Sequence, residues 1–212
     1  MNSLSFLCDT FLGTYAEESF KSLVELYATI EHDTQLFCFE NSIACGPGCG
    51  TCCEHFIPDI TNAEARLVAA YLLFVKNDQT LLDKLENFDQ NSEGPCPLYD
   101  FGNAHHCTVY EVRPLICRLF GACASQDKNG SAVFRRCRYN TEGTMPMLLH
   151  FTNEVPVMQD FAYAIRSLDM DQVGARLLPE AVTEMAEQLK FLRSMLGFQN
   201  DNPDDTPNPI AS

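Results

Sequence analysis

Four cysteines stand within nine residues, CGPGCGTCC (45–53). Three residues separate Cys45 from Cys49, two separate Cys49 from Cys52, and Cys53 follows directly. Short turns of this kind let two thiolates approach one metal ion, because each sulfur must lie about 2.3 Å from a bound zinc. Buried inert thiols would have apolar neighbours, whereas these have glycines. The pattern therefore predicts metal ligation rather than disulfides or core packing.

The same stretch leaves the number of metal centres open. Gly46, Gly48 and Gly50 permit positive φ and leave room for backbone amides to point at sulfur. Adjacent Cys52 and Cys53 would point in opposite directions if the backbone were extended. The two thiols then either serve two neighbouring centres, or one of them is a supporting or redox-active thiol beside a single centre.

A second group of cysteines follows after a gap of 42 residues. Two distant groups that together supply the ligands are a common layout of folded metal sites, so we predict that both groups bind the metal. The predicted ligands are Cys45, Cys49, Cys52, Cys53, Cys96, Cys107, Cys117 and Cys123. For Cys123 and Cys137 a buried free thiol is an equal alternative, and for Cys8 and Cys38 it is the expected state.

The second group lies in a basic segment of an acidic chain. The net charge is −15, yet residues 105–140 hold six basic side chains against two acidic ones. A centre with four thiolates carries about two negative charges, which must be offset when it is partly buried. We expect Arg113 and Arg118 to donate hydrogen bonds to cysteine sulfur or to Glu111, which would also raise the reduction potential of an iron–sulfur cluster.

The identity of the metal stays open. The Cys96-Pro97 pair and the glycine-rich loop favour an iron–sulfur cluster, since ferredoxins use similar ligation. Zinc bound by four thiolates tolerates almost any spacing of two ligand pairs. His55, His105 and His106 are further candidate ligands, but the surplus of thiols makes ordinary loop histidines the expectation. The predicted cofactor is thus an iron–sulfur cluster or zinc.

Helices must position these segments. Apolar stripes at helical spacing predict helices over 11–31, 156–169 and 179–196. A capping box begins another helix at Thr61, because Glu64 lies three residues later.

Shorter elements complete the expected fold. Residues 36–60 are predicted as a cysteine- and glycine-rich loop region, and Pro114 suits the first turn of a short helix. An Asn-Gly turn predicts that 119–125 and 132–139 pair as a ribbon. We therefore expect a mainly α fold, with helices packed around a cysteine-rich, loop-rich metal-binding centre and at most a small β-ribbon.

The expected organisation has four parts along the chain. Residues 1–40 form an N-terminal helical segment, 41–140 the cysteine-cluster metal-binding domain, and 141–198 helices that pack on it. The Pro- and Asp-rich tail, 199–212, is expected to be disordered.

Composition limits the location and the partners. The N-terminus lacks the basic and apolar regions of a signal peptide, and no apolar run reaches about 18 residues. We expect a cytoplasmic protein, where thiols stay reduced. Its negative charge argues against nucleic-acid and membrane partners. The expected partners are the metal ion or cluster and a protein docked on the amphipathic helices.

The stretch CPLYDFGNAHHCTVYEVRPLICRLFG (96–121), together with CGPGCGTCC, resembles the zinc- or iron-chelating cysteine-cluster family called YkgJ or CxxCxxCC. The first cysteine spacing is three residues here, where the family name has two. The resemblance implies metal chelation, and members are often labelled iron–sulfur oxidoreductases. The matching positions are Cys45, Cys49, Cys52, Cys53, Cys96, Pro97, Leu98, Cys107, Tyr110, Glu111, Arg113, Pro114, Cys117, Arg118 and Phe120.

Three functions follow from these features. The first is a metal-binding protein that holds an iron–sulfur cluster or zinc and could be redox active. The second is a structural zinc module that acts in an assembly. The third is an enzyme, such as an iron–sulfur or thiol oxidoreductase, or one associated with methyl transfer, since a flagellin lysine methylase carries a similar cluster. The sequence has no P-loop, dinucleotide-binding fingerprint or Ser-His-Asp signature.

Overall fold

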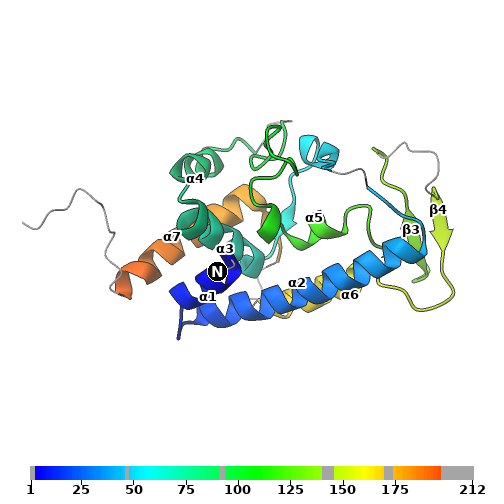
Figure 1. Cartoon of the computed structure of the whole chain (residues 1–212), viewed down its shortest axis with the longest axis horizontal. Coiled ribbons are helices and arrows are strands. Elements are labelled where there is room, and N and C mark those ends of the chain that lie inside the picture. The colour runs from blue at the N-terminus through cyan, green and yellow to red at the C-terminus, as the bar shows by residue number, and fades with distance from the viewer. Residues whose placement is uncertain (1–2, 46–47, 91–93, 140–145, 170–173, 197–212) are drawn as a thin grey trace, which may run out of the picture.

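The structure is a computed structural model, and it describes residues 3–45, 48–90, 94–139, 146–169 and 174–196. More than half of the chain is helical, and the sheets are small (Figure 1), as the sequence predicted. The helices are α1 (Ser3–Thr10), α2 (Tyr15–Glu40), α3 (Asn62–Ala70), α4 (Gln79–Glu86), α5 (Leu115–Leu119), α6 (Met158–Arg166) and α7 (Leu178–Met195). Single 3-10 turns cover Thr51–Glu54 and Tyr110–Val112, and a π-helical turn, Tyr71–Lys76, continues α3.

The long helix α2 begins at Tyr15, inside its predicted range of 11–31, and ends at Glu40, well beyond it. Its buried stripe does not stop at Ile30 but continues at Thr34 and Phe37, which are four and seven residues later. This apolar continuation keeps the backbone helical, so residues 36–40, expected to be loop, form the last turn of α2.

Helix α3 has the predicted cap and a second one that the sequence did not indicate. Thr61 is the N-cap, and its reciprocal hydrogen bonds with Glu64 form the capping box. The carboxylate of Asp169, far along the chain, accepts hydrogen bonds from the amides of Asn62 (2.9 Å) and Ala63 (2.6 Å). The free amides of the first helical turn are thus satisfied by two separate acidic groups.

One main hydrophobic core joins α1, α2, α3, α4 and α7. Leu7, Phe20, Leu67 and Leu189 are among its fully buried side chains. Helix α7 packs along α3 and α4, and α6 lies against α2 and α5 (Figure 1). The predicted C-terminal helices are confirmed, with ends one to three residues inside or outside the predicted ranges.

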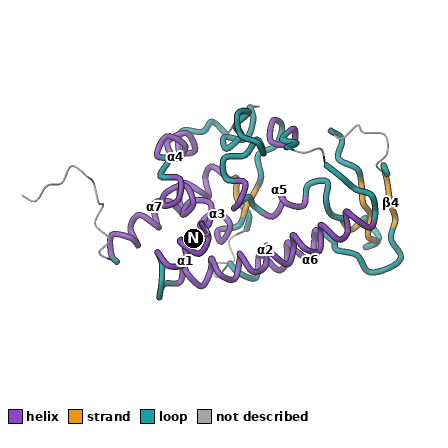
Figure 2. The backbone as a smooth tube through the Cα atoms, viewed as in Figure 1, coloured by secondary structure: helices purple, strands orange, loops and turns teal. Residues whose placement is uncertain are grey.

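A ribbon forms at the predicted turn and has a third strand, but its strands are shorter than the predicted 119–125 and 132–139, because α5 extends to Leu119. Strand β2 (Ser125–Gln126) pairs antiparallel with β3 (Ala132–Arg135), and β3 pairs with β4 (Leu148–His150) (Figure 2). A small second core under this sheet includes Phe37 and Phe134, so the sheet is anchored at the C-terminal end of α2.

A further two-stranded sheet pairs β1 (Asp59–Ile60) with β5 (Arg176–Leu177). It ties the segment after the first cysteine group to the start of α7. Pro114 is the N-cap of α5 rather than a residue of its first turn.

The predicted parts 1–40, 41–140 and 141–198 each contribute side chains to the main core, and their division into domains stays a prediction. The predicted disordered tail, 199–212, lies outside the described residues. Among the described helices, none is both long and apolar enough to span a bilayer.

Candidate metal centre

Eight cysteines from both groups line one cavity of about 210 Å³. The cavity lies between the 3-10 turn Thr51–Glu54, the loop before α5, and the segment after β3. Its thiols belong to Cys45, Cys49, Cys52, Cys53, Cys96, Cys107, Cys117 and Cys137. Seven of these are predicted ligands. The structure therefore brings the two cysteine groups together.

Backbone hydrogen bonds hold the two groups against each other. The amide of Cys96 donates to the carbonyl of Cys53 at 2.8 Å, which joins the two segments directly. Tyr99 pairs with Cys107 in an isolated β-bridge. The Tyr99 hydroxyl donates to the Glu54 carboxylate at 2.8 Å, a second link between the segments.

Two glycines allow this close approach. Gly48 has φ +68°, and a Cβ there would lie 2.6 Å from the Ala104 carbonyl oxygen. Gly50 has an ordinary negative φ, but a Cβ at this position would overlap the side chain of His106. Gly50 is thus required for packing rather than for backbone conformation. Gly46 lies outside the described residues.

Cys52 and Cys53 face the same cavity. They lie in a 3-10 turn, not in an extended segment, so the opposite orientation expected for a strand does not arise. Their Sγ atoms are 3.9 Å apart. The adjacent thiols are therefore not directed to separate sites by the backbone.

Burial keeps several of these thiols protonated when no cation is bound. Burial raises the pKa of Cys96 to about 11 and that of Cys45 to about 12. Burial likewise raises the pKa of Cys117. A thiolate at Cys52 would raise the pKa of each of these three thiols further, and also that of Cys107. A bound cation reverses this preference, because it stabilises thiolate.

The donor set fits a thiophilic metal in its chemistry. Thiolates select zinc, copper(I) and iron–sulfur clusters over magnesium or calcium. Within the described ranges, no three His, Cys, Asp or Glu side chains stand in position to hold one ion. Ligation therefore requires thiols at the cavity to come closer together.

Arg113 and Arg118, the two arginines predicted to support the centre, both line the cavity. The two side chains differ from each other in their contacts. Arg118 donates to the carbonyl oxygens of Arg113 (2.9 Å) and Glu111 (2.8 Å) and lies 4.0 Å above the Tyr27 ring. Its guanidinium thus holds the turn before α5. Burial raises the pKa of Cys107, and the charge of Arg113 offsets part of that rise.

An aromatic stack borders the cavity. The His105 ring lies 3.9 Å from the Tyr110 ring, and the Arg113 guanidinium carbon lies 3.8 Å from the same ring. Two groups so close must occupy opposite faces of Tyr110. His55 stacks on Tyr139 instead and is not among the residues that line the cavity.

Cys123 is placed elsewhere and Cys137 takes a position at the cavity. The buried Cys123 thiol donates to the Pro156 carbonyl at 3.3 Å, and Cys38 donates to the Ala122 carbonyl at 3.5 Å. Cys137 lies two residues after the end of β3, and the sequence left its role undecided. The turn of the ribbon, which brings β3 back toward the cavity, was the signal that could have selected it.

The fold and the cavity define a mainly helical protein with a cysteine-lined chelating site. Residues 44–138 match the sequence model of the CxxCxxCC family, described as "Putative zinc- or iron-chelating domain". The match confirms the resemblance, spans both cysteine groups and supports metal binding. No match was found among curated proteins or among solved structures.

Proposed function

We propose that this protein binds an iron–sulfur cluster through thiolates from both cysteine groups and takes part in electron transfer. The observation that carries the proposal is the gathering of eight thiols at one cavity. When bound, such a cluster would accept and release single electrons. The residues that would hold it are among Cys45, Cys49, Cys52, Cys53, Cys96, Cys107, Cys117 and Cys137.

The size of the cavity supports a polynuclear centre. A water molecule takes about 30 Å³ in the liquid, so a cavity of about 210 Å³ is far larger than one metal ion needs. Apolar and aromatic side chains, among them Leu98, Val109 and Phe120, complete the lining, while Cys45 and Cys49 are exposed to solvent. Solvent exposure is one of the factors that set a cluster's potential.

Two zinc ions are the second candidate. Two four-thiolate zinc sites need eight thiols, the number that lines the cavity. The printed description of the domain also names both metals. In this case the protein would be a structural module rather than an electron carrier.

A reactive-thiol enzyme is less well supported. Reactive cysteines have a lowered pKa, because the thiolate is the nucleophile. Cys117 is adjacent to Arg118, yet burial raises its pKa. The Cys117 thiol is thus kept protonated, although an arginine follows it in the sequence.

Anaerobic purification followed by iron, zinc and acid-labile sulfide quantification tests the proposal. We expect iron and sulfide in similar amounts, with a broad visible absorption that reduction bleaches. Two zinc per chain without sulfide would favour the second candidate. Absence of both metals would contradict metal binding altogether.

Paired cysteine variants test the ligand set. Cys52→Ser should lose most of the bound metal, because Cys52 lines the cavity with its Sγ 3.9 Å from that of Cys53. Cys123→Ser is the matched control, since Cys123 is buried away from the cavity and its serine hydroxyl can still donate to Pro156. Loss of metal in folded Cys123→Ser would show that the ligand set is different.

A further inference from the structure

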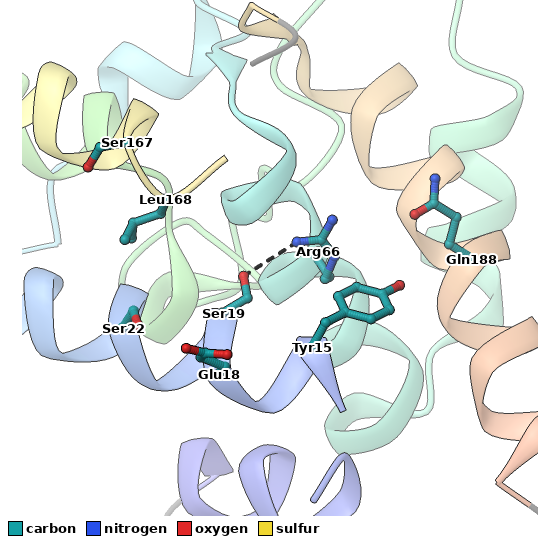
Figure 3. A pocket seen from close by; sticks show the side chains of 8 residues that line it. All are labelled: Tyr15, Glu18, Ser19, Ser22, Arg66, Ser167, Leu168 and Gln188. Atoms are coloured by element: carbon teal, nitrogen blue, oxygen red, sulfur yellow. Dashed lines mark hydrogen bonds between the residues drawn. The ribbon is translucent and has the colours of Figure 1, made fainter. Parts of the chain in front are cut away.

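A second cavity of about 490 Å³ lies between α2, α3, the end of α6 and α7 (Figure 3). None of the cysteines lines it. Its volume is within the range of roughly 300–1,000 Å³ that is usual for small-molecule sites.

The wall formed by α2 is polar and partly open to solvent. Tyr15, Glu18, Ser19 and Ser22 follow the i, i+3, i+4, i+7 spacing and line the cavity together. Tyr15 and Glu18 are exposed, whereas the neighbouring stripe of α2 through Phe20 is buried and apolar. The cavity is thus accessible from solvent, and its α2 wall suits a polar ligand.

Arg66 of α3 lies in the middle of this site and has hydrogen-bond donors that are not used. One guanidinium nitrogen, Nη1, donates to the Ser19 hydroxyl at a long 3.4 Å (Figure 3). The buried Nε has no hydrogen-bond partner, and no carboxylate forms an ion pair with Arg66, among the residues described. The Tyr15 ring lies 5.2 Å from the guanidinium carbon and holds it in place.

An unpaired, partly buried cation favours an anionic ligand. A guanidinium offers two parallel N–H groups, which match the two oxygens of a carboxylate. The Ser19 hydroxyl accepts from Arg66, and its own proton remains to donate to the same ligand.

Glu18 decides which anion fits. Its carboxylate lines the same cavity, so the described lining carries one positive and one negative side chain. A phosphate dianion would place two further negative charges beside Glu18. A ligand with one carboxylate and one ammonium group matches both charges instead.

We propose that this cavity binds a free amino acid, with its carboxylate on Arg66 and its ammonium group toward Glu18. Ser22 of α2 and Gln188 of α7 line the cavity on opposite sides of Arg66, and either can offer a hydrogen bond to the side chain of the ligand (Figure 3). The site is independent of the metal centre in its residues, so it stands or falls separately from the proposed function.

Thermal shift and calorimetric titration of the full chain as purified test the proposal. The probes are the twenty common amino acids, with acetate, methylamine and inorganic phosphate as partial mimics. We expect saturable binding by at least one amino acid, with weaker or undetectable binding of the mimics. Binding of phosphate alone, or no binding of any amino acid at millimolar concentration, would overturn it.

Variants separate the two ends of the ligand. Arg66→Gln should weaken binding by about tenfold or more, since it removes charge-assisted hydrogen bonds. Glu18→Gln, at an exposed position, should weaken amino-acid binding and leave acetate binding unchanged or stronger. Glu25→Gln, an exposed change on α2 outside the cavity, is the control. Equal affinity in wild type and both cavity variants would also contradict the proposal.

Discussion

A single buried carboxylate serves two helices. Glu64 closes the capping box with Thr61 at the start of α3. Its Oε1 also accepts hydrogen bonds from the amide of Leu115 (2.6 Å), the first residue of α5, and from the Tyr27 hydroxyl (3.1 Å). Because α5 carries Cys117, this carboxylate fixes one wall of the metal centre without lining the cavity.

Glu64→Gln should therefore destabilise the protein by about 1–3 kcal/mol, because charged acceptors are replaced and one amide hydrogen points at donors. The measurement is urea unfolding monitored by circular dichroism. Glu86→Gln, an exposed change on α4, should have almost no effect. If both variants unfold at the same urea concentration as the wild type, the hydrogen bonds of Glu64 at the starts of α3 and α5 contribute nothing to the free energy of unfolding.

Burial also governs Cys123, a thiol outside the cavity. Burial first, and the charge of Cys38 second, raise the pKa of Cys123 from 9.0 to about 12. The native state thus keeps a proton that the unfolded chain releases above about pH 9. The resulting stability is fully present below pH 9 and is lost as pH rises toward 12.

We predict that the stability of the reduced protein falls between about pH 9 and about pH 12, and that Cys123→Ser flattens this fall. Serine does not ionise in this range. Urea midpoints across the pH series measure the slope. Ser131→Ala removes an exposed hydroxyl and should leave the slope at its wild-type value. A Cys123→Ser slope equal to that of the wild type would count against this assignment.

At the scale of elements, contact between the two cysteine segments depends on the absence of a side chain at Gly50. Gly50 lies against His106, and the space for a methyl group is already filled. The 3-10 turn with Cys52 and Cys53 follows Gly50 directly. Displacement of this turn would move both thiols away from those of Cys96 and Cys107.

Gly50→Ala should lower both stability, by about 1–3 kcal/mol through overpacking, and the amount of bound metal. Metal content and thermal unfolding are the measurements. Gly174→Ala is the control, because a methyl group there meets nothing within 4 Å. Full metal content in Gly50→Ala would show that the turn adapts.

The sequence predicted the elements whose signals are local. The Thr61 capping box, the stripes of α2, α6 and α7, and the Asn-Gly ribbon all rest on residues within a few positions of each other. The hydrogen bonds of Asp169 to the start of α3, and of Glu64 to the start of α5, join residues more than 50 positions apart in the sequence. No local spacing could therefore predict them. Cys137 was missed for the same reason, since only the path of β3 brings it back.

At the scale of the whole molecule, the main core does not include most of the cavity. Leu7, Phe20, Leu67 and Leu189 pack between helices that need no metal to meet. Only some of the cysteines, such as Cys96, belong to this core. The helical body and the cysteine loops are therefore expected to respond differently to metal removal.

Removal of metal by a chelator should leave the helical circular dichroism nearly unchanged while the cysteine loops lose protection in hydrogen exchange. The affected segments would be 48–58 and 96–114. A cooperative loss of all helix on chelation would instead identify a structural metal, as in zinc fingers.

Helix α3 faces both sites. Glu64 reaches the start of α5 beside the metal centre, and Arg66, two residues later, stands in the second cavity. A small rotation of α3 would change both environments at once. If metal alters the affinity for an amino acid by some factor, linkage requires the amino acid to alter metal affinity by the same factor. The metal content of the protein would then depend on the concentration of the free amino acid.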